Sequence, residues 1–194
     1  MACCSGVSAE FAFGETSEAL GTPLTITLPS AQARDAVFNV TVAYSTSSTA
    51  TALGWLTKEQ TADKKQPYMF SQCQAIHARS IIPCQDSPVC KLTYSASVTV
   101  PAGLQALMSA LHEGKEDGEG VTTFKFNQPV SMPSYLIAIA VGLLESKEIG
   151  PRSKVWAEPS VVRSFAAWYL LELSFHLSLV SLPGGGCCVR VCGY

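Results

Sequence analysis

The sequence is poor in charge. Only 14% of its 194 residues are charged, and 13 Lys and Arg face 15 Asp and Glu, which gives a formal net charge of −2. Because phosphate contacts need clustered cations, the absence of a basic excess argues against a nucleic-acid-binding protein. Hydrophobic residues make up 47% of the chain, which excludes charge-driven disorder. The length predicts one globular domain, or at most two small ones.

The sequence also lacks the short motifs that mark common catalytic centres. It contains no G-x-S-x-G turn, no phosphate-binding G-x-x-x-x-G-K-[ST] loop and no H-E-x-x-H helix. The three histidines, His77, His112 and His176, are far apart in the chain, and the eight cysteines do not follow the short spacings that zinc sites use. From these patterns we predict no catalytic residue, no metal ligand and no cofactor in this chain.

Export and membrane signals are weak. The chain starts Met-Ala-Cys-Cys-Ser-Gly, without the basic start and apolar run of a secretory signal, so we expect reduced thiols and a cytoplasmic location. The best candidate for a membrane span is Phe165–Leu182, but Glu172, His176 and three serines interrupt it. A span needs about 20 predominantly apolar residues, so we expect no membrane association, and a tail anchor remains the alternative.

The first two-thirds of the chain has the pattern of short strands. In Leu92–Val100 every second residue is apolar or aromatic, which places Leu92, Tyr94, Ala96, Val98 and Val100 on one face. Leu104–Leu111 fits either a short helix or a strand, and Glu113–Gly120 is expected to be a polar hairpin tip. Further strands are expected at Leu24–Leu28, Val37–Tyr44, Thr122–Phe126, Tyr135–Gly142 and Lys154–Trp156. We therefore predict a mainly β protein, a β-sandwich or saddle with little helix.

Polar residues gather in one otherwise apolar segment, Pro67–Asp86. They admit two interpretations. In the structural one, Arg79 and Asp86 pair across a turn and the glutamines bond to the backbone, because buried polar groups need partners. In the functional one, some of them face a ligand. The polar residues concerned are Gln72, Gln74, His77, Arg79, Gln85 and Asp86.

The same segment carries a family resemblance. Phe70–Arg79, Ile82–Pro88 and Lys91–Tyr94 closely resemble the gluzincin zinc aminopeptidases, in the branch of leukotriene A(4) hydrolase and aminopeptidase B. Matching segments occur in the family's order from about Gly14 to Pro159. They are Ala52–Thr57, Ala106–Ala110, Pro133–Ala138, Gly150–Arg152 and Val155–Trp156.

The resemblance implies a fold and a site. The fold is the saddle-like amino-terminal β-domain that precedes the family's zinc domain. By position, Gln74 would help to hold the free α-amine of a substrate and Gln72 would line the adjoining pocket. A side-chain carbonyl oxygen is a suitable acceptor for an ammonium group. Arg79 and Asp86 resemble the family's structural framework, and His77 is expected to be structural.

The departures from the family lead to further expectations. The zinc ligands of a complete member are absent from this sequence, so we expect zinc only in the complete protein and a chain that is inactive alone. We expect an unmatched start at 1–10, a β-domain at 11–160 that is truncated at both ends, and an aberrant apolar, Cys- and Gly-rich tail at 161–194. The complete enzyme would release amino-terminal residues from peptides and hydrolyse a lipid epoxide. The alternative is a non-catalytic binding or regulatory isoform that associates with the full-length enzyme or another partner.

Overall fold

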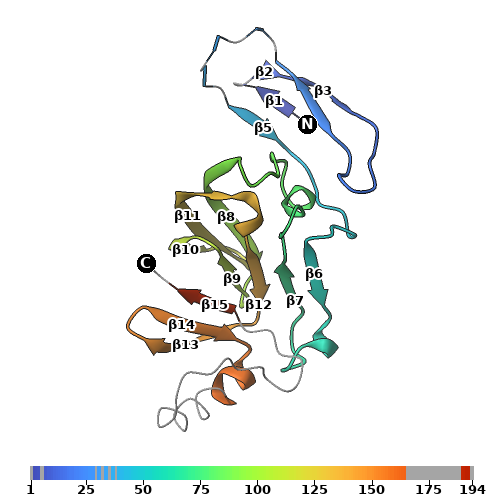
Figure 1. Cartoon of the computed structure of the whole chain (residues 1–194). Helices are drawn as coiled ribbons and strands as arrows, with labels where there is room; N and C mark the ends of the chain where they lie inside the picture. Colours follow the sequence, from blue (N-terminus) through green and yellow to red (C-terminus); the bar gives the residue numbers. More distant parts are fainter. Residues whose placement is uncertain are drawn as a thin grey trace. The chain divides into compact units, whose positions relative to one another are not determined.

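The computed structural model describes residues 2–4, 7–28, 30–31, 33–34, 36–37, 39–164 and 189–192 (Figure 1). The chain divides into two compact units, Met1–Ser47 and Ser48–Tyr194. Described strands occur throughout both units and all of their pairings are antiparallel. The predicted mainly β class is confirmed.

The amino-terminal unit contains two small sheets. The first has the order β2-β1-β5, and the second is the pair β3-β4. Ile26 and Leu28 pack on buried Ala9 beside this pair. The predicted strand at Leu24–Leu28 is present as β4, whereas the strand expected over Val37–Tyr44 is only three residues long. The strands are β1 (Ala2–Cys4), β2 (Val7–Ser8), β3 (Glu10–Phe13), β4 (Leu24–Thr27) and β5 (Val40–Val42).

Three sheets make up the carboxy-terminal unit. Their strand orders are β10-β11-β8, β6-β7-β12-β9 and β13-β14-β15. The strands of the first are β8 (Lys91–Pro101), β10 (Leu111–Asp117) and β11 (Val121–Pro133). Those of the second are β6 (Leu53–Leu56), β7 (Tyr68–Ser71), β9 (Gln105–Met108) and β12 (Ile139–Gly142). Those of the third are β13 (Glu145–Gly150), β14 (Ser153–Ala157) and β15 (Val189–Cys192).

Short helical turns connect these strands. The turn at 159–164 begins where the Asp63 carboxylate accepts a hydrogen bond of 3.2 Å from the backbone N–H of Ser160, which satisfies a free amide at the helix start. The 3₁₀ turns are η1 (Lys58–Gln60), η2 (Ala78–Ser80) and η3 (Ser134–Leu136).

The main core lies where β8, β9 and β11 meet. Val100, Ala106, Phe124 and Phe126 are buried there, and Ala96 and Val98 pack against them. Along β8 the even-numbered residues are buried or half-buried and the odd-numbered ones are exposed. The predicted alternation of this strand is therefore confirmed.

Two aromatic side chains of β7 lie over glycines of the neighbouring strands. The Tyr68 and Phe70 rings are stacked with their centroids 5.9 Å apart. A Cβ atom added to Gly54 of β6 would lie 2.5 Å from Phe70 Cζ, and one added to Gly142 of β12 would lie 2.5 Å from Tyr68 Cδ2. Both rings thus occupy space that only glycine leaves open, and they fix β7 between its two neighbours.

Some local predictions were incomplete or wrong. Of the two alternatives for Leu104–Leu111, the strand is right, because β9 pairs with β12. The predicted tip Glu113–Gly120 is wrong for its first part: β10 continues to Asp117 because its residues pair with β11, so only 118–120 form the tip. Tyr135–Gly142 begins in η3 and becomes a strand only at Ile139.

The membrane prediction concerns residues that are not described. Phe165–Leu182 and the alternating residues within it lie outside the described residues. Across the part of the chain that the structure does describe, no helix is long and apolar enough to cross a bilayer.

Candidate functional site

The two candidate glutamines follow directly after β7. The backbone N–H of Gln72 donates a hydrogen bond of 2.8 Å to the carbonyl oxygen of Ala52, and the hydroxyl of Ser71 accepts one of 2.9 Å from the N–H of Ile139. Gln72 and Gln74 are exposed, whereas Cys73 between them is only 3% exposed. The peptide bond after Gln74 is cis. The segment thus points its thiol into the protein and both amides outward.

Beyond Gln74 the chain turns back towards the start of β6. The N–H of His77 donates to the carbonyl oxygen of Cys73 at 2.9 Å, which closes the turn. Ser80 Oγ accepts a hydrogen bond of 3.0 Å from the N–H of Ala52 and donates one of 2.8 Å to the carbonyl oxygen of His77. Thr51 Oγ1 and His77 Nδ1 share a hydrogen bond of 2.8 Å. His77 therefore has a side-chain partner, Thr51, just before β6.

Arg79 and Asp86 form an ion pair across the loop after the turn. Arg79 Nε lies 3.2 Å from Asp86 Oδ2, the N–H of Arg79 donates to the same oxygen at 3.1 Å, and its guanidinium donates to the Asp86 carbonyl oxygen at 3.0 Å. The other carboxylate oxygen, Oδ1, accepts a hydrogen bond of 2.6 Å from Ser134 Oγ. The Asp86 side chain is 2% exposed and Ser134 is 1% exposed, whereas the Arg79 side chain is 30% exposed, so the carboxylate is buried and the guanidinium reaches it from a half-buried position.

The electrostatics of the loop follow from this burial. Burial alone would raise the pKa of the Asp86 carboxyl, but the hydrogen bonds from Ser134 and Arg79 and the Arg79 charge outweigh it and hold the pKa below its ordinary value. Burial raises the pKa of the Cys73 thiol, and burial together with the Asp86 charge raises the pKa of the Cys84 thiol to about 11. Both thiols are therefore protonated near neutral pH and pack as small apolar groups with Ala52, Ala78 and Ile81.

The exposed amides of Gln72 and Gln74 can each offer a neutral oxygen acceptor and two N–H donors to a ligand. They supply no nucleophile and no general base. Among the described residues, no three His, Cys, Asp or Glu side chains gather closely enough to hold a metal ion. The described residues therefore do not fit the zinc ion that the family resemblance implies for the complete protein.

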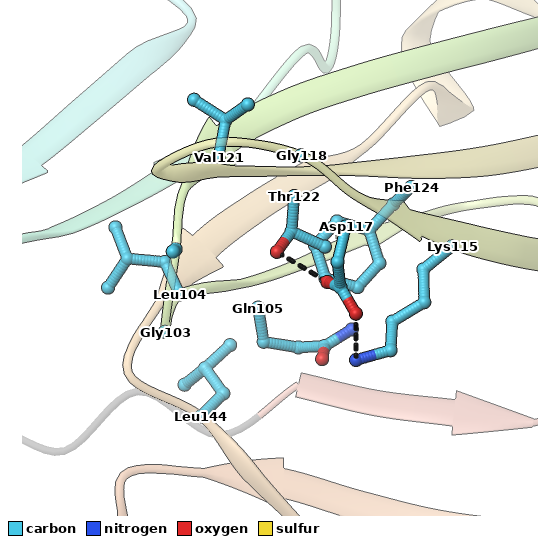
Figure 2. A pocket seen from close by; sticks show the side chains of 11 residues that line it. Gly103, Leu104, Gln105, Lys115, Asp117, Gly118, Val121, Thr122, Phe124 and Leu144 are labelled. Atoms are coloured by element: carbon cyan, nitrogen blue, oxygen red, sulfur yellow. Dashed lines mark hydrogen bonds and ion pairs between the residues drawn. The ribbon is translucent and has the colours of Figure 1, made fainter.

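A pocket of about 350 Å³ lies elsewhere in the carboxy-terminal unit (Figure 2). Buried Phe124 lines it, as do Lys115 and Asp117, which form an ion pair in which Lys115 Nζ is 3.6 Å from Asp117 Oδ2. Figure 2 shows the Thr122 hydroxyl turned towards Asp117, to which it donates a hydrogen bond of 2.8 Å. Neither Gln72 nor Gln74 lines this pocket, so it is separate from the candidate site.

Three residues that shape the site were not predicted from the sequence. Thr51, Ser80 and Ser134 hold it through hydroxyl hydrogen bonds, of which the longest in sequence joins residues 48 positions apart. Serine and threonine are common in loops, and no spacing rule links residues so distant. Only the pairing of β7 with its neighbouring strands brings them together.

Comparison with known proteins gives consistent results. The family model of the peptidase M1 N-terminal domain matches residues 4–136. The chain is 48% identical over 161 residues to leukotriene A-4 hydrolase of Xenopus laevis, and 46% identical over 158 residues to leucine aminopeptidase 2 of Phaeosphaeria nodorum. These alignments cover 81% and 78% of this chain but only 26% and 25% of the relatives. The chain thus spans about a quarter of their length.

Solved structures agree with the sequence comparison. Native leukotriene A4 hydrolase of Saccharomyces cerevisiae superposes with a TM-score of 0.75 at 34% identity, covering 89% of this chain and 26% of that one. The M1 zinc metallopeptidase of Deinococcus radiodurans shares the fold, with a TM-score of 0.56 at 22% identity over 78% of this chain and 34% of that one. The described β-fold is the one predicted from the family resemblance.

Proposed function

The chain belongs to the peptidase M1 N-terminal domain family. We propose that it forms one wall of a substrate cleft in which Gln74 recognises the free α-ammonium of a peptide. The observation that supports this most is the exposure of Gln72 and Gln74 on either side of buried Cys73. Gln74 Oε1 would accept a hydrogen bond from the ammonium, and Gln72 would contact the next part of the substrate. A neutral amide costs less to desolvate than a carboxylate when the cleft closes.

The names of the relatives suggest the reactions in which this wall takes part. They are leucine aminopeptidases and leukotriene A-4 hydrolases, so the two substrate classes are peptides with a free amino-terminus and an epoxide lipid. The catalytic zinc of such an enzyme would come from residues outside those described here. We therefore propose that this chain has no peptidase activity by itself. We also propose that residues 11–160 form the functional β-domain and that the protein is cytoplasmic.

Nuclear magnetic resonance of the full chain tests amine recognition. A dipeptide amide with a free amino-terminus is titrated in, and the side-chain NH₂ signals of the glutamines are followed. We expect the Gln74 signals to shift with the free peptide and not with its acetylated form, which lacks the ammonium charge. Gln74→Ala should abolish the accompanying shift of the Gln72 side-chain NH₂ signals. Gln66→Ala is the matched control, because Gln66 is also exposed but lies before β7. Equal responses to both peptides would refute the proposal.

An activity assay tests the proposal that the chain has no peptidase activity by itself. With added zinc, the chain should not cleave an aminoacyl anilide. Cleavage that co-purifies with the chain and that a chelator abolishes would show that the chain itself holds a catalytic metal. This result would overturn the proposal that the chain is inactive alone.

A second function is a non-catalytic module that associates with a full-length enzyme. It is favoured by large exposed apolar side chains in the carboxy-terminal unit, where Val89 is 83%, Val130 68% and Leu136 48% exposed. Such side chains are typical of interaction surfaces when they are contiguous. Size-exclusion chromatography of the chain mixed with Xenopus laevis leukotriene A-4 hydrolase tests it: co-elution supports association, and separate elution at micromolar concentrations opposes it.

A further inference from the structure

We propose that Thr51 and Ser80 are positioning residues, whose hydroxyl groups hold the turn at Gln74 in the shape that receives an amine. This inference rests on the proposed role of Gln74. It concerns two residues outside the family segment that carries the glutamine pair, Thr51 in the loop before β6 and Ser80 at the end of η2.

Ser80 ties the far side of the turn to the start of β6. Its oxygen accepts a hydrogen bond from the N–H of Ala52 while its hydroxyl proton goes to the carbonyl oxygen of His77. A serine hydroxyl has one proton to donate, so these two bonds fix both the acceptor and the donor direction of the group. The Ser80 side chain is thus oriented, and it sets the distance between Ala52 and His77.

Thr51 and Ala52 together contact the chain on both sides of Gln74. Before the glutamine, the Ala52 carbonyl oxygen accepts the hydrogen bond of 2.8 Å from the Gln72 N–H. After it, Thr51 Oγ1 shares the 2.8 Å hydrogen bond with His77 Nδ1. A shift of the Thr51–Ala52 backbone would therefore move both ends of the turn at once.

Side-chain packing alone does little to fix the orientation of the turn that carries Gln74. The buried side chains beneath it are those of Ala52, Cys73 and Ala78, which are small and present few directional contacts. Gln74 itself is exposed, so burial does not orient it. Hydrogen bonds are directional and weaken steeply with poor geometry, and for that reason the two hydroxyls, together with the backbone hydrogen bonds of Gln72 and His77, fix the position of Gln74.

Matched substitutions separate the hydroxyl from the shape of the side chain. Thr51→Val keeps the branched shape and removes the hydrogen bond, whereas Thr51→Ser keeps the hydroxyl. Because Thr51 is exposed, neither change should alter the melting temperature appreciably. At Ser80 the pair is Ser80→Val and Ser80→Thr, which have nearly the same volume and differ in the hydroxyl.

The readout is the free-peptide titration described above, on the full chain. We expect Thr51→Val to bind the free dipeptide amide roughly 2- to 10-fold more weakly, the range that the loss of one hydrogen bond gives, and Ser80→Val, which loses two, to bind at least as weakly. Thr51→Ser and Ser80→Thr should retain the affinity of the original chain. Wild-type affinity in both valine variants would overturn the proposal, even if Gln74→Ala abolishes binding.

A second measurement keeps this inference separate from the amine-binding role. Relaxation of the Gln74 backbone amide reports the order of the turn without any ligand. Thr51→Val should lower its order parameter while Thr51→Ser should not. If the original chain does not bind the peptide, the function proposed for Gln74 fails, and the order parameters alone then decide whether Thr51 positions the turn. If Ser80→Val unfolds the chain, the comparison of Thr51→Val with Thr51→Ser decides whether the hydroxyl positions the turn.

Discussion

Ser134 donates a hydrogen bond of 2.6 Å to Asp86 Oδ1 across 48 residues of sequence. Ser134 opens η3 at the end of β11, and Asp86 lies in the loop that follows the Gln74 turn. The opposite carboxylate oxygen is held by Arg79. A single buried carboxylate thus connects the loop after the Gln74 turn to the end of β11, a strand of the main core, and holds that loop against it.

Removal of the Ser134 hydroxyl should weaken this connection. We expect Ser134→Ala to lower the free energy of unfolding by about 1–3 kcal/mol, because it leaves a buried carboxylate oxygen without its donor. Urea unfolding followed by circular dichroism measures the effect. Ser146→Ala, at an exposed position of β13, is the control and should change the stability by less than about 0.5 kcal/mol.

The pH dependence of stability gives an independent test of the same carboxylate. The folded pKa of Asp86 lies below its ordinary value, so its contribution is present above the unfolded pKa and is lost as the pH falls through the folded pKa. Without the Ser134 hydrogen bond the folded pKa rises. Ser134→Ala should therefore lose less stability through Asp86 on acidification, so the difference in the free energy of unfolding between the variant and the original chain should shrink as the pH falls below the unfolded pKa. Identical acid-unfolding curves would contradict this role of Asp86.

The sequence predicted the strands better than the site. The alternating pattern of β8 identified its buried face because one side of the strand covers the core. The polar residues of β10 concealed a strand, since its ladder with β11 satisfies the backbone while most side chains face solvent. The Arg79–Asp86 pair is seven positions apart, a distance that a loop can close. Thr51 and Ser134 reach the site only through sheet pairing, which no local pattern contains.

The glycine opposite Tyr68 should not tolerate a side chain. In Gly142→Ala the new methyl group would lie 2.5 Å from the Tyr68 ring, so the ring or the strand must move. We expect a loss of about 1–3 kcal/mol in the free energy of unfolding, the usual cost of overpacking. Gly150→Ala is the control: the nearest atom to its added Cβ is 4.0 Å away. Equal stability of the two variants would show that Tyr68 moves aside freely.

The thiol of Cys84 should be unreactive in the folded chain. Burial and the Asp86 charge raise its pKa from 9.0 to about 11, which reduces the thiolate fraction near pH 8 roughly 100-fold. Alkylation by iodoacetamide, followed by mass spectrometry of the Cys84 peptide, should be slower in the native chain than in urea by at least that order. Comparable rates in both conditions would mean that the loop opens readily or that Asp86 does not lie near the thiol.

A negative charge at position 74 should strengthen amine binding. Gln74→Glu replaces a neutral oxygen acceptor with a carboxylate, which adds a direct Coulomb attraction to the ammonium. At this exposed position the carboxylate stays hydrated, so we expect only a few-fold tighter binding of the free dipeptide amide. The gain should shrink as salt is added, since ions screen exposed charges. Gln66→Glu adds the same charge elsewhere on the exposed surface and controls for a general electrostatic effect. If both glutamates raise the affinity equally, the amine does not bind at Gln74; if only Gln74→Glu does, the ammonium lies against that side chain.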